Sequence, residues 1–105
     1  MKDNIVVIFV TSPITTGKKI ALSLLDKKLV ACVNEIRNIN SFYWWENKIC
    51  KDKESLLIIK TNKKKVNKVV KEIKKIHPYK VPEIIVLPVS KCNKEYALWV
   101  NNTVM

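Results

Sequence analysis

Glycine, histidine and arginine are almost absent from this sequence of 105 residues. The single glycine, Gly17, excludes a P-loop and the dinucleotide-binding fingerprint, because both need several residues without a Cβ where backbone meets phosphate. The single histidine, His77, excludes a metal site that takes two or three imidazoles from one chain. No apolar run approaches the roughly 20 residues that a transmembrane helix needs. A mass of 12.2 kDa is typical of one domain, and we expect residues 1–105 to form a single one.

Few residues are available for redox or catalytic chemistry. The three cysteines are an odd number without a CxxC pair, which predicts reduced thiols rather than a disulfide framework. The apolar stretch at 5–10 is too short for the hydrophobic region of a signal peptide, so we expect a cytoplasmic protein. The nine acidic residues are scattered, and no Cys–His pair comes with an orienting third group. We therefore expect neither an enzyme nor a required cofactor.

Positive charge is abundant and comes almost entirely from lysine. The net charge is +11, and residues 60–80 hold nine lysines and one glutamate. Such a patch attracts phosphate, but specific nucleic-acid contacts favour arginine, of which there is only Arg37. The strand expected at 49–60 also lacks the glycine and aromatic residues of an RNA-recognition motif. We expect a solvated helix face and no specific nucleic-acid partner.

The order of apolar patterns predicts four strands and three helices. Strands are expected at 5–10, 29–45, 49–60 and 83–89, with an irregularity at 38–40 and a turn at 46–48. A helix capped by Thr15 or Thr16 should follow the first strand, a second should cover 66–76, and a short one 93–100. Pro88 predicts that the last strand ends there or lies at a sheet edge.

This order is that of an α+β, ferredoxin-like βαββαβ sandwich with a long hairpin and a short C-terminal helix. Both main helices should lie on one face of the sheet, because parallel crossovers are right-handed. The runs IVVIFV and EIIVLPV are apolar at both alternating sets of positions, so the other face also needs a cover. Copies of the same chain are the simplest cover, and the surplus length of the hairpin 29–60 suits pairing with a neighbour's edge.

Cys32 and His77 are the candidate metal ligands that residue chemistry suggests. A thiolate and an imidazole suit copper or zinc, but two ligands do not close a tetrahedral site. Glu83, Tyr79 or a second chain could complete the shell. The alternative is structural: Cys32 lies in an apolar strand where thiols are usually packed, and His77 stands at a helix end where it could act as a cap.

Six motifs in order give the sequence a specific resemblance: VTSP, ACVN, SFYWWENK, LLIIKT, HPYKVPEIIVLPV and YALWV. Together they resemble the CutA-type divalent-cation tolerance proteins over nearly the whole chain. The resemblance implies a ferredoxin-like homotrimer held together by inter-subunit strand pairing. It also implies a role in the response to metal ions, with copper(II) favoured over Zn²⁺ at inter-subunit clefts.

The resemblance also assigns residues. Cys32 and His77 match positions proposed as metal ligands in the family, whereas the third proposed ligand, a cysteine in some members, is Val10 here. Four further residues match recurring family positions near the cleft between subunits: Tyr79, Glu83, Lys60 and Trp45. The alternative function is a trimeric scaffold or signalling module that binds a protein partner through its hairpins without a physiological metal.

Overall fold

The computed structural model describes residues 4–104 and contains one sheet of four strands with three α-helices. The elements are β1 (Ile5–Pro13), α1 (Ile14–Asp26), β2 (Cys32–Trp45), β3 (Lys48–Asn62), a 3₁₀ turn η1 (Lys63–Lys65), α2 (Val66–Ile76), β4 (Ile84–Pro88) and α3 (Lys94–Thr103). The antiparallel sheet has the strand order β2-β3-β1-β4. The predicted α+β fold with a βαββαβ core and a C-terminal helix is confirmed.

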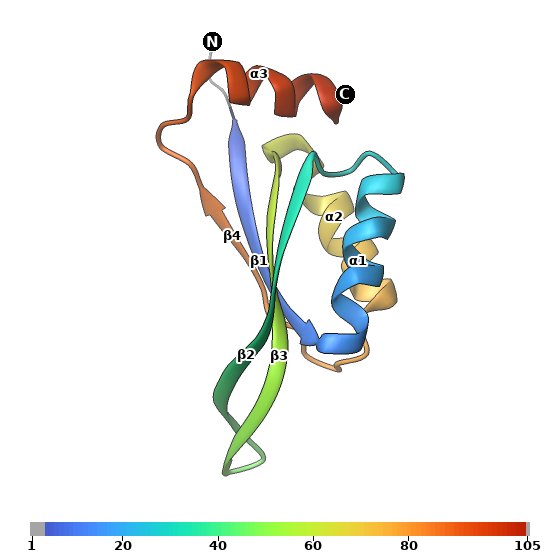
Figure 1. Ribbon diagram of the computed structural model, residues 1–105, viewed down its shortest axis with the longest axis vertical. Helices are drawn as coiled ribbons and strands as arrows, with labels where there is room; N and C mark the ends of the chain where they lie inside the picture. Colours follow the sequence, from blue (N-terminus) through green and yellow to red (C-terminus); the bar gives the residue numbers. More distant parts are fainter. Residues whose placement is uncertain (1–3, 105) are drawn as a thin grey trace.

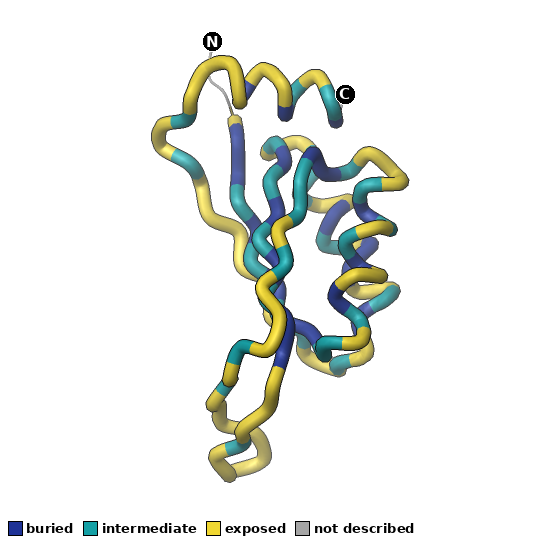
Figure 2. Tube along the Cα trace, in the orientation of Figure 1, coloured by how far each residue is buried: buried dark blue, intermediate teal, exposed yellow. Residues whose placement is uncertain are grey.

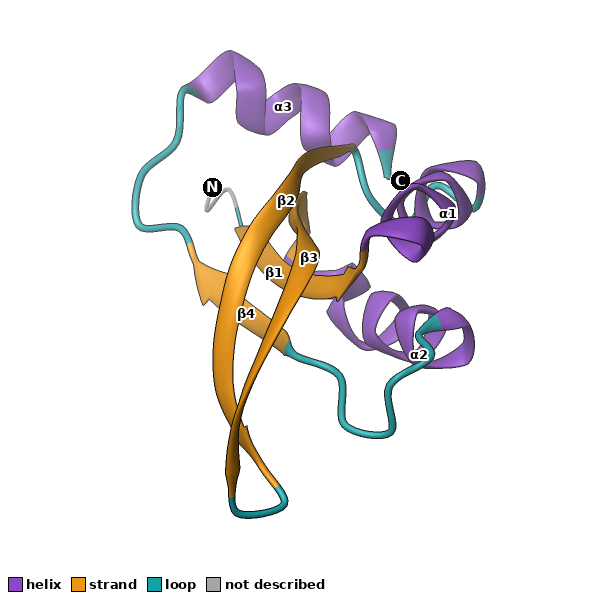
Figure 3. Cartoon of the chain, turned by 60° about the horizontal axis from the view of Figure 1, so that its bottom comes forward, coloured by secondary structure: helices purple, strands orange, loops and turns teal. Residues whose placement is uncertain are grey.

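The helices α1 and α2 lie side by side on one face of the sheet, while α3 crosses one end of it (Figures 1 and 3). Alternate residues of each strand point to this face and pack on the helices in the main core. The core members that are fully buried include Ile8, Leu24, Leu57 and Ile73. Under α3, a second cluster forms from Ile5, Ala31, Ala97, Val100 and Val104.

Glu72 joins the two helices of the main layer. Its carboxylate accepts hydrogen bonds from Ser23 Oγ at 2.9 Å and from Lys27 Nζ at 2.8 Å, both on the α1 side. Lys75 lies 3.6 Å from the other oxygen. These partners hold the pKa of the Glu72 carboxyl below its ordinary value, with the Lys27 hydrogen bond the largest cause. The one acidic residue of the lysine-rich segment is thus buried and paired.

The start of α1 differs from the sequence prediction. Thr15 and Thr16 lie inside the helix, which begins at Ile14 with Pro13 as N-cap and no side-chain cap. The strand before it continues past Val10, because Ser12 and Pro13 still pair with Ser55 and Glu54 of β3. Pro13 can end the strand and lead directly into the helix, since the fixed φ of proline also suits the start of a helix.

The predicted hairpin is long and its irregularities fall where the sequence placed them. The register between β2 and β3 shifts between Ile36 and Ile39, and Asn38 has a φ of 64°. Glu46 and Asn47 also have positive φ, which is the geometry of a tight hairpin turn. β2 starts at Cys32 and not at Leu29 as predicted; Leu29 and Val30 belong to the loop after α1. The end of the hairpin extends beyond the helix layer and is exposed (Figure 2).

The second face of the sheet, here called the open face, is covered by no helix of residues 4–104 over most of its length (Figure 3). The strand register places apolar residues there from all four strands: Val7, Phe9, Ile36, Leu56, Ile58, Ile85 and Leu87. Ile36, Ile85 and Leu87 are 47%, 47% and 39% exposed. β4 lies at the edge and ends at Pro88, as predicted. The predicted uncovered apolar face is therefore present.

Candidate functional site

The predicted site residues fall into two groups at different levels of the open face. Cys32 and Lys60 lie at the level of α3, where they are register partners on β2 and β3. His77, Tyr79 and Glu83 lie around the end of β1. Trp45 is the last residue of β2 before the hairpin turn, and it lines the same cavity as Tyr79 and Glu83.

Cys32 is a half-buried free thiol beneath α3. Its Sγ lies 3.9 Å from the side-chain oxygen of Asn34, and this same oxygen accepts a hydrogen bond from Lys60 Nζ. The phenol of Tyr96, from α3, is also beside the thiol. Burial raises the pKa of Tyr96, and the neighbouring Cys32 adds to this shift.

His77 is buried, and both of its ring nitrogens have partners within the chain. Nε2 lies 2.7 Å from the carbonyl oxygen of Thr11, and Nδ1 accepts the backbone N–H of Tyr79 at 3.1 Å. Because Nδ1 is the acceptor, Nε2 carries the proton and donates it to Thr11. The ring thus ties the end of α2 to β1 instead of capping the helix carbonyls.

One chain does not bring Cys32 and His77 together. Cys32 is level with Lys60, and Lys60 pairs with Val7 of β1. His77 binds Thr11, four residues further along β1, which corresponds to about 13 Å along the strand. Within residues 4–104, no three His, Cys, Asp or Glu side chains are grouped closely enough to hold a metal ion.

A cavity of about 760 Å³ lies between the outer half of the hairpin and the segment that joins α2 to β4. Three of the predicted residues line it: Trp45, Tyr79 and Glu83. Tyr79 Oη donates a hydrogen bond to Glu54 Oε2 at 2.7 Å, and Thr11 Oγ1 donates to Glu83 Oε1 at 3.3 Å. The cavity therefore combines aromatic rings with two carboxylates.

Both tyrosines of this region stay protonated well above neutral pH. Tyr79 has a raised pKa, chiefly through burial and then through its hydrogen bond to Glu54. Tyr43 donates a hydrogen bond to Asp52 on the neighbouring strand, which raises the pKa of Tyr43 to about 12. Both phenols therefore act as hydrogen-bond donors at neutral pH.

Sequence reasoning missed Glu54, the most buried acid in this region at 4% exposure. A signal for it exists in the strand pattern. Glu54 has the same parity as Leu56 and Ile58, which places its side chain on the open face rather than in solvent beyond the hairpin. The tyrosine that meets it comes from a loop 25 residues away in sequence, and strand periodicity says nothing about that loop.

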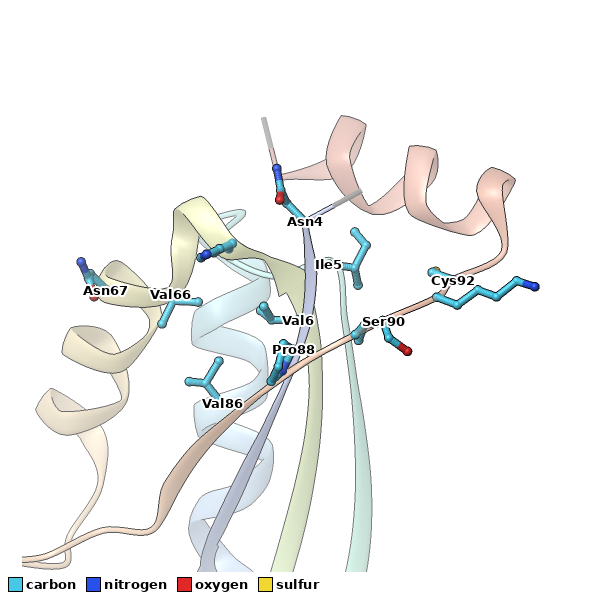
Figure 4. A pocket seen from close by; sticks show the side chains of 12 residues that line it. Asn4, Ile5, Val6, Val66, Asn67, Val86, Pro88, Ser90 and Cys92 are labelled. Atoms are coloured by element: carbon cyan, nitrogen blue, oxygen red, sulfur yellow. The ribbon is translucent and has the colours of Figure 1, made fainter. Parts of the chain in front are cut away.

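A second cavity, of about 780 Å³, lies between the start of α2, β4 and the loop that leads to α3. Figure 4 shows Val6, Val66 and Val86 on its apolar side, with Asn4, Asn67 and Ser90 around them. Lys63 and Lys91 also line it. None of the predicted site residues belongs to this cavity.

Comparison with known proteins identifies consistent relatives. The family model described as CutA1 divalent ion tolerance protein matches residues 5–103. The rice protein named CutA 1, chloroplastic, is 42% identical over 99 residues, which are 93% of this chain. The chain spans only 56% of the rice protein's length. The divalent-cation tolerance protein CutA of Archaeoglobus fulgidus is 42% identical over 98 residues, covering 92% of this chain and 95% of that protein.

The solved structures agree with the sequence relatives. The structure described as the periplasmic divalent cation tolerance protein CutA from Archaeoglobus fulgidus superimposes with a TM-score of 0.93 at 39% identity. The match covers 96% of this chain and 99% of that one. No helix within residues 4–104 is long and apolar enough to cross a membrane.

Proposed function

Because the chain belongs to the CutA1 divalent ion tolerance protein family, we propose that it binds divalent metal ions, copper(II) in preference to Zn²⁺, as part of the response to such ions. In this proposal it is a cytoplasmic, non-enzymatic homotrimer, and each metal lies in a cleft between two subunits. Cys32 of one copy and His77 and Glu83 of another supply the ligands.

The open face supports self-assembly. Apolar side chains from all four strands lie on it, and the outer edges of β2 and β4 have no strand partner within residues 4–104. Exposed apolar patches and free strand edges favour association. Copies that pair edge to edge and face to face would cover both.

The separation of Cys32 from His77 carries the inter-subunit part of the proposal. With about 13 Å of strand between the levels of the two residues, a single chain offers no closed metal site. Glu83 and His77, by contrast, both contact Thr11. Glu83 accepts a hydrogen bond from the Thr11 hydroxyl, and His77 Nε2 lies against the Thr11 carbonyl oxygen. A second copy therefore has to bring its thiol to the His77 level.

Metal binding at His77 requires a local exchange of partners. Nδ1 has the lone pair that a metal would use, and the backbone N–H of Tyr79 now occupies it. Coordination would replace this hydrogen bond, so Tyr79 would move with the metal. A change in Tyr79 fluorescence or in the mobility of residues 77–83 would therefore be a second indicator of metal binding.

The test is calorimetric titration of the reduced full chain with Cu²⁺ and with Zn²⁺. We expect saturable binding of one ion per chain that Cys32→Ser and His77→Ala each weaken at least tenfold. Cys92→Ser is the matched control, because Cys92 is also a half-buried free thiol but lies on the loop before α3. Metal affinity unchanged in both Cys32→Ser and His77→Ala would remove these residues from the site.

A further inference from the structure

The cavity between α2, β4 and the loop before α3 lies on the helix side of the sheet and not on the open face. One of its lining residues, Val86 of β4, is the register partner of Ile8, which packs in the main core. Partners directly opposite each other in a sheet share a face, so Val86 also points to the helix side. Ile84 on the same strand packs against the main core, whereas Val86 is 37% exposed. The layer of α1 and α2 therefore ends before β4 does and leaves an apolar floor (Figure 4).

The assembly proposed above leaves this cavity accessible. Copies that cover the open face lie on the opposite side of the sheet. A neighbour's strand that paired with the edge of β4 would extend the sheet in its own plane, so it would widen the floor without closing the helix side. None of the residues assigned to the cleft between subunits lines the cavity. The cavity is thus separate from the proposed metal site.

Backbone hydrogen bonds hold the two sides of the cavity in place. The N–H of Lys63 donates to the carbonyl oxygen of Asn4 at 2.7 Å, which ties η1 to the start of β1. The N–H of Val89 donates to the carbonyl oxygen of Ile5 at 3.3 Å, which ties the end of β4 to the same strand. The cavity is therefore formed before a ligand arrives.

The charged side chains of the lining are all positive. Lys63 of η1 and Lys91 of the loop before α3 line the cavity, and no acidic side chain of residues 4–104 does. Both salt bridges found in this part of the chain belong to Glu72, so neither ammonium has a carboxylate partner there. Uncharged side chains that can form hydrogen bonds also line the cavity: Asn4, Asn67 and Ser90. A concave apolar surface with charge of one sign attracts a ligand of the opposite sign, which here is an anion.

We propose that this cavity binds a carboxylate that carries an aliphatic body. The carboxylate would accept charge-assisted hydrogen bonds from Lys63 and Lys91. The body would displace water from Val6, Val66 and Val86, which come from three different elements. A volume of about 780 Å³ is within the usual range of small-molecule sites.

Two features of the lining separate this ligand class from others. No aromatic side chain of residues 4–104 lines the cavity, so it offers no ring on which a base or an aromatic ligand could stack. Phosphate sites are usually built from backbone N–H groups or from arginine. Here the N–H groups of Lys63 and Lys64 already have partners within the chain, and the only arginine, Arg37, lies on β2. The lining therefore suits an aliphatic carboxylate better than a phosphate or an aromatic anion.

The test is a titration of the isotope-labelled, metal-free full chain, followed through its amide NMR signals. Three probes separate charge from apolar contact: hexanoate has both, hexanamide has the same chain without the charge, and acetate has the charge without the chain. The buffer contains 0.15 M salt, where the Debye length is about 8 Å, so that the net charge of +11 does not by itself collect anions.

We expect hexanoate to saturate at millimolar concentrations and to bind at least fivefold more tightly than either of the other probes. It should shift the amide signals of residues 63–67 and 86–92. Equal affinity for hexanoate and hexanamide, a lack of saturation, or shifts confined to other residues would overturn the proposal.

Variants locate the site. Lys63→Gln and Lys91→Gln should each weaken hexanoate binding at least threefold, and both lysines are exposed, so the fold tolerates the change. Lys64→Gln is the matched control, because Lys64 is also an exposed lysine of η1 but does not line the cavity. An equal loss of affinity in Lys63→Gln and Lys64→Gln would indicate general attraction to positive charge and contradict the site, as would no loss in Lys63→Gln and Lys91→Gln. Cys32→Ser, which removes a proposed metal ligand, should leave hexanoate affinity unchanged, so the two proposals can fail independently.

Discussion

At the scale of single residues, two tyrosine–carboxylate pairs on the open face differ in burial. Tyr79 bonds to the buried Glu54, whereas Tyr43 bonds to the exposed Asp52. Removing the phenol oxygen of Tyr79 leaves a buried carboxylate without its donor, which costs about 1–3 kcal/mol. We expect Tyr79→Phe to lower the free energy of unfolding by that amount in urea denaturation.

Tyr43→Phe is the control for this prediction, because its partner can bind water instead. Its effect should stay below about 0.5 kcal/mol, as is usual for surface substitutions. Both variants have to be measured at one protein concentration, since stability depends on concentration in an oligomer. An equal loss of unfolding free energy in Tyr79→Phe and Tyr43→Phe would show that the burial of Glu54 does not make its hydrogen bond more stabilising.

Glu72 gives the protein a defined response to acid. Its folded-state pKa is below the ordinary 4.5, so the carboxylate stabilises the folded state fully above pH 4.5. This contribution is lost as the pH falls through the lower, folded-state pKa, where the carboxyl is protonated in both states. Glu72→Gln removes it at every pH. We therefore expect a stability gap between the natural protein and this variant that is constant at neutral pH and closes progressively below pH 4.5.

Urea titrations at a series of pH values measure this gap. Glu46→Gln is a suitable control, because Glu46 is exposed in the hairpin turn. If the stability difference between the natural protein and Glu72→Gln stayed constant down to pH 3, the hydrogen bonds from Ser23 and Lys27 would not favour the charged carboxylate over the protonated carboxyl.

The residue scale is also where prediction from sequence was weakest. The identities of Cys32 and His77 as candidate ligands follow from their chemistry, but their positions about 13 Å apart along the strand direction depend on register. That His77 uses both ring nitrogens within the chain depends on a carbonyl 66 residues away. Such contacts are set by tertiary packing, which leaves no periodic trace in the sequence.

At the scale of elements, α3 depends on its N-terminal cap. Asn93 Oδ1 accepts the backbone N–H groups of Glu95 and Tyr96 at 2.9 and 3.3 Å. Asn93→Ala should therefore cost about 1 kcal/mol of stability, whereas Asn93→Ser, which keeps a capping oxygen, should cost only a few tenths. Hydrogen exchange of the α3 amides would locate the loss, and equal exchange in the two variants would contradict the role of the cap.

Element types and order were predictable because apolar periodicity is strong in this chain. The stripe of α2 and the runs in β1, β3 and β4 predicted the observed elements, and Asn47 predicted the turn. The start of α1 was wrong, because pairing of Ser12 and Pro13 with β3 outweighed the capping preference of Thr15 and Thr16. Pairing between distant strands decides where such elements begin and end, and the preferences of single residues do not predict that pairing.

At the scale of the whole molecule, the two sides of the sheet have opposite character. The helix side is closed by a packed core, and the outer surface of α2 carries exposed lysines. The open face shows apolar side chains, and the hairpin extends the molecule to 47 Å along its longest axis. A partner is therefore expected on the sheet side, while the charged helix layer remains in contact with solvent.

This asymmetry allows a matched pair of substitutions to test assembly. Ile85 on the open face is 47% exposed and Leu22 on α1 is 54% exposed, so a lysine at either position is tolerated by a single chain. If copies cover the open face, Ile85→Lys places a charge inside the interface, which costs several kcal/mol and dissociates the oligomer. Leu22→Lys leaves the interface intact. Light scattering should report about three times 12.2 kDa for the natural chain and for Leu22→Lys, and one times that mass for Ile85→Lys. A mass of 12.2 kDa for the natural chain in solution would contradict assembly and remove the basis for a metal site shared between subunits. An Ile85→Lys variant that keeps the mass of the natural oligomer would place the interface elsewhere on the chain.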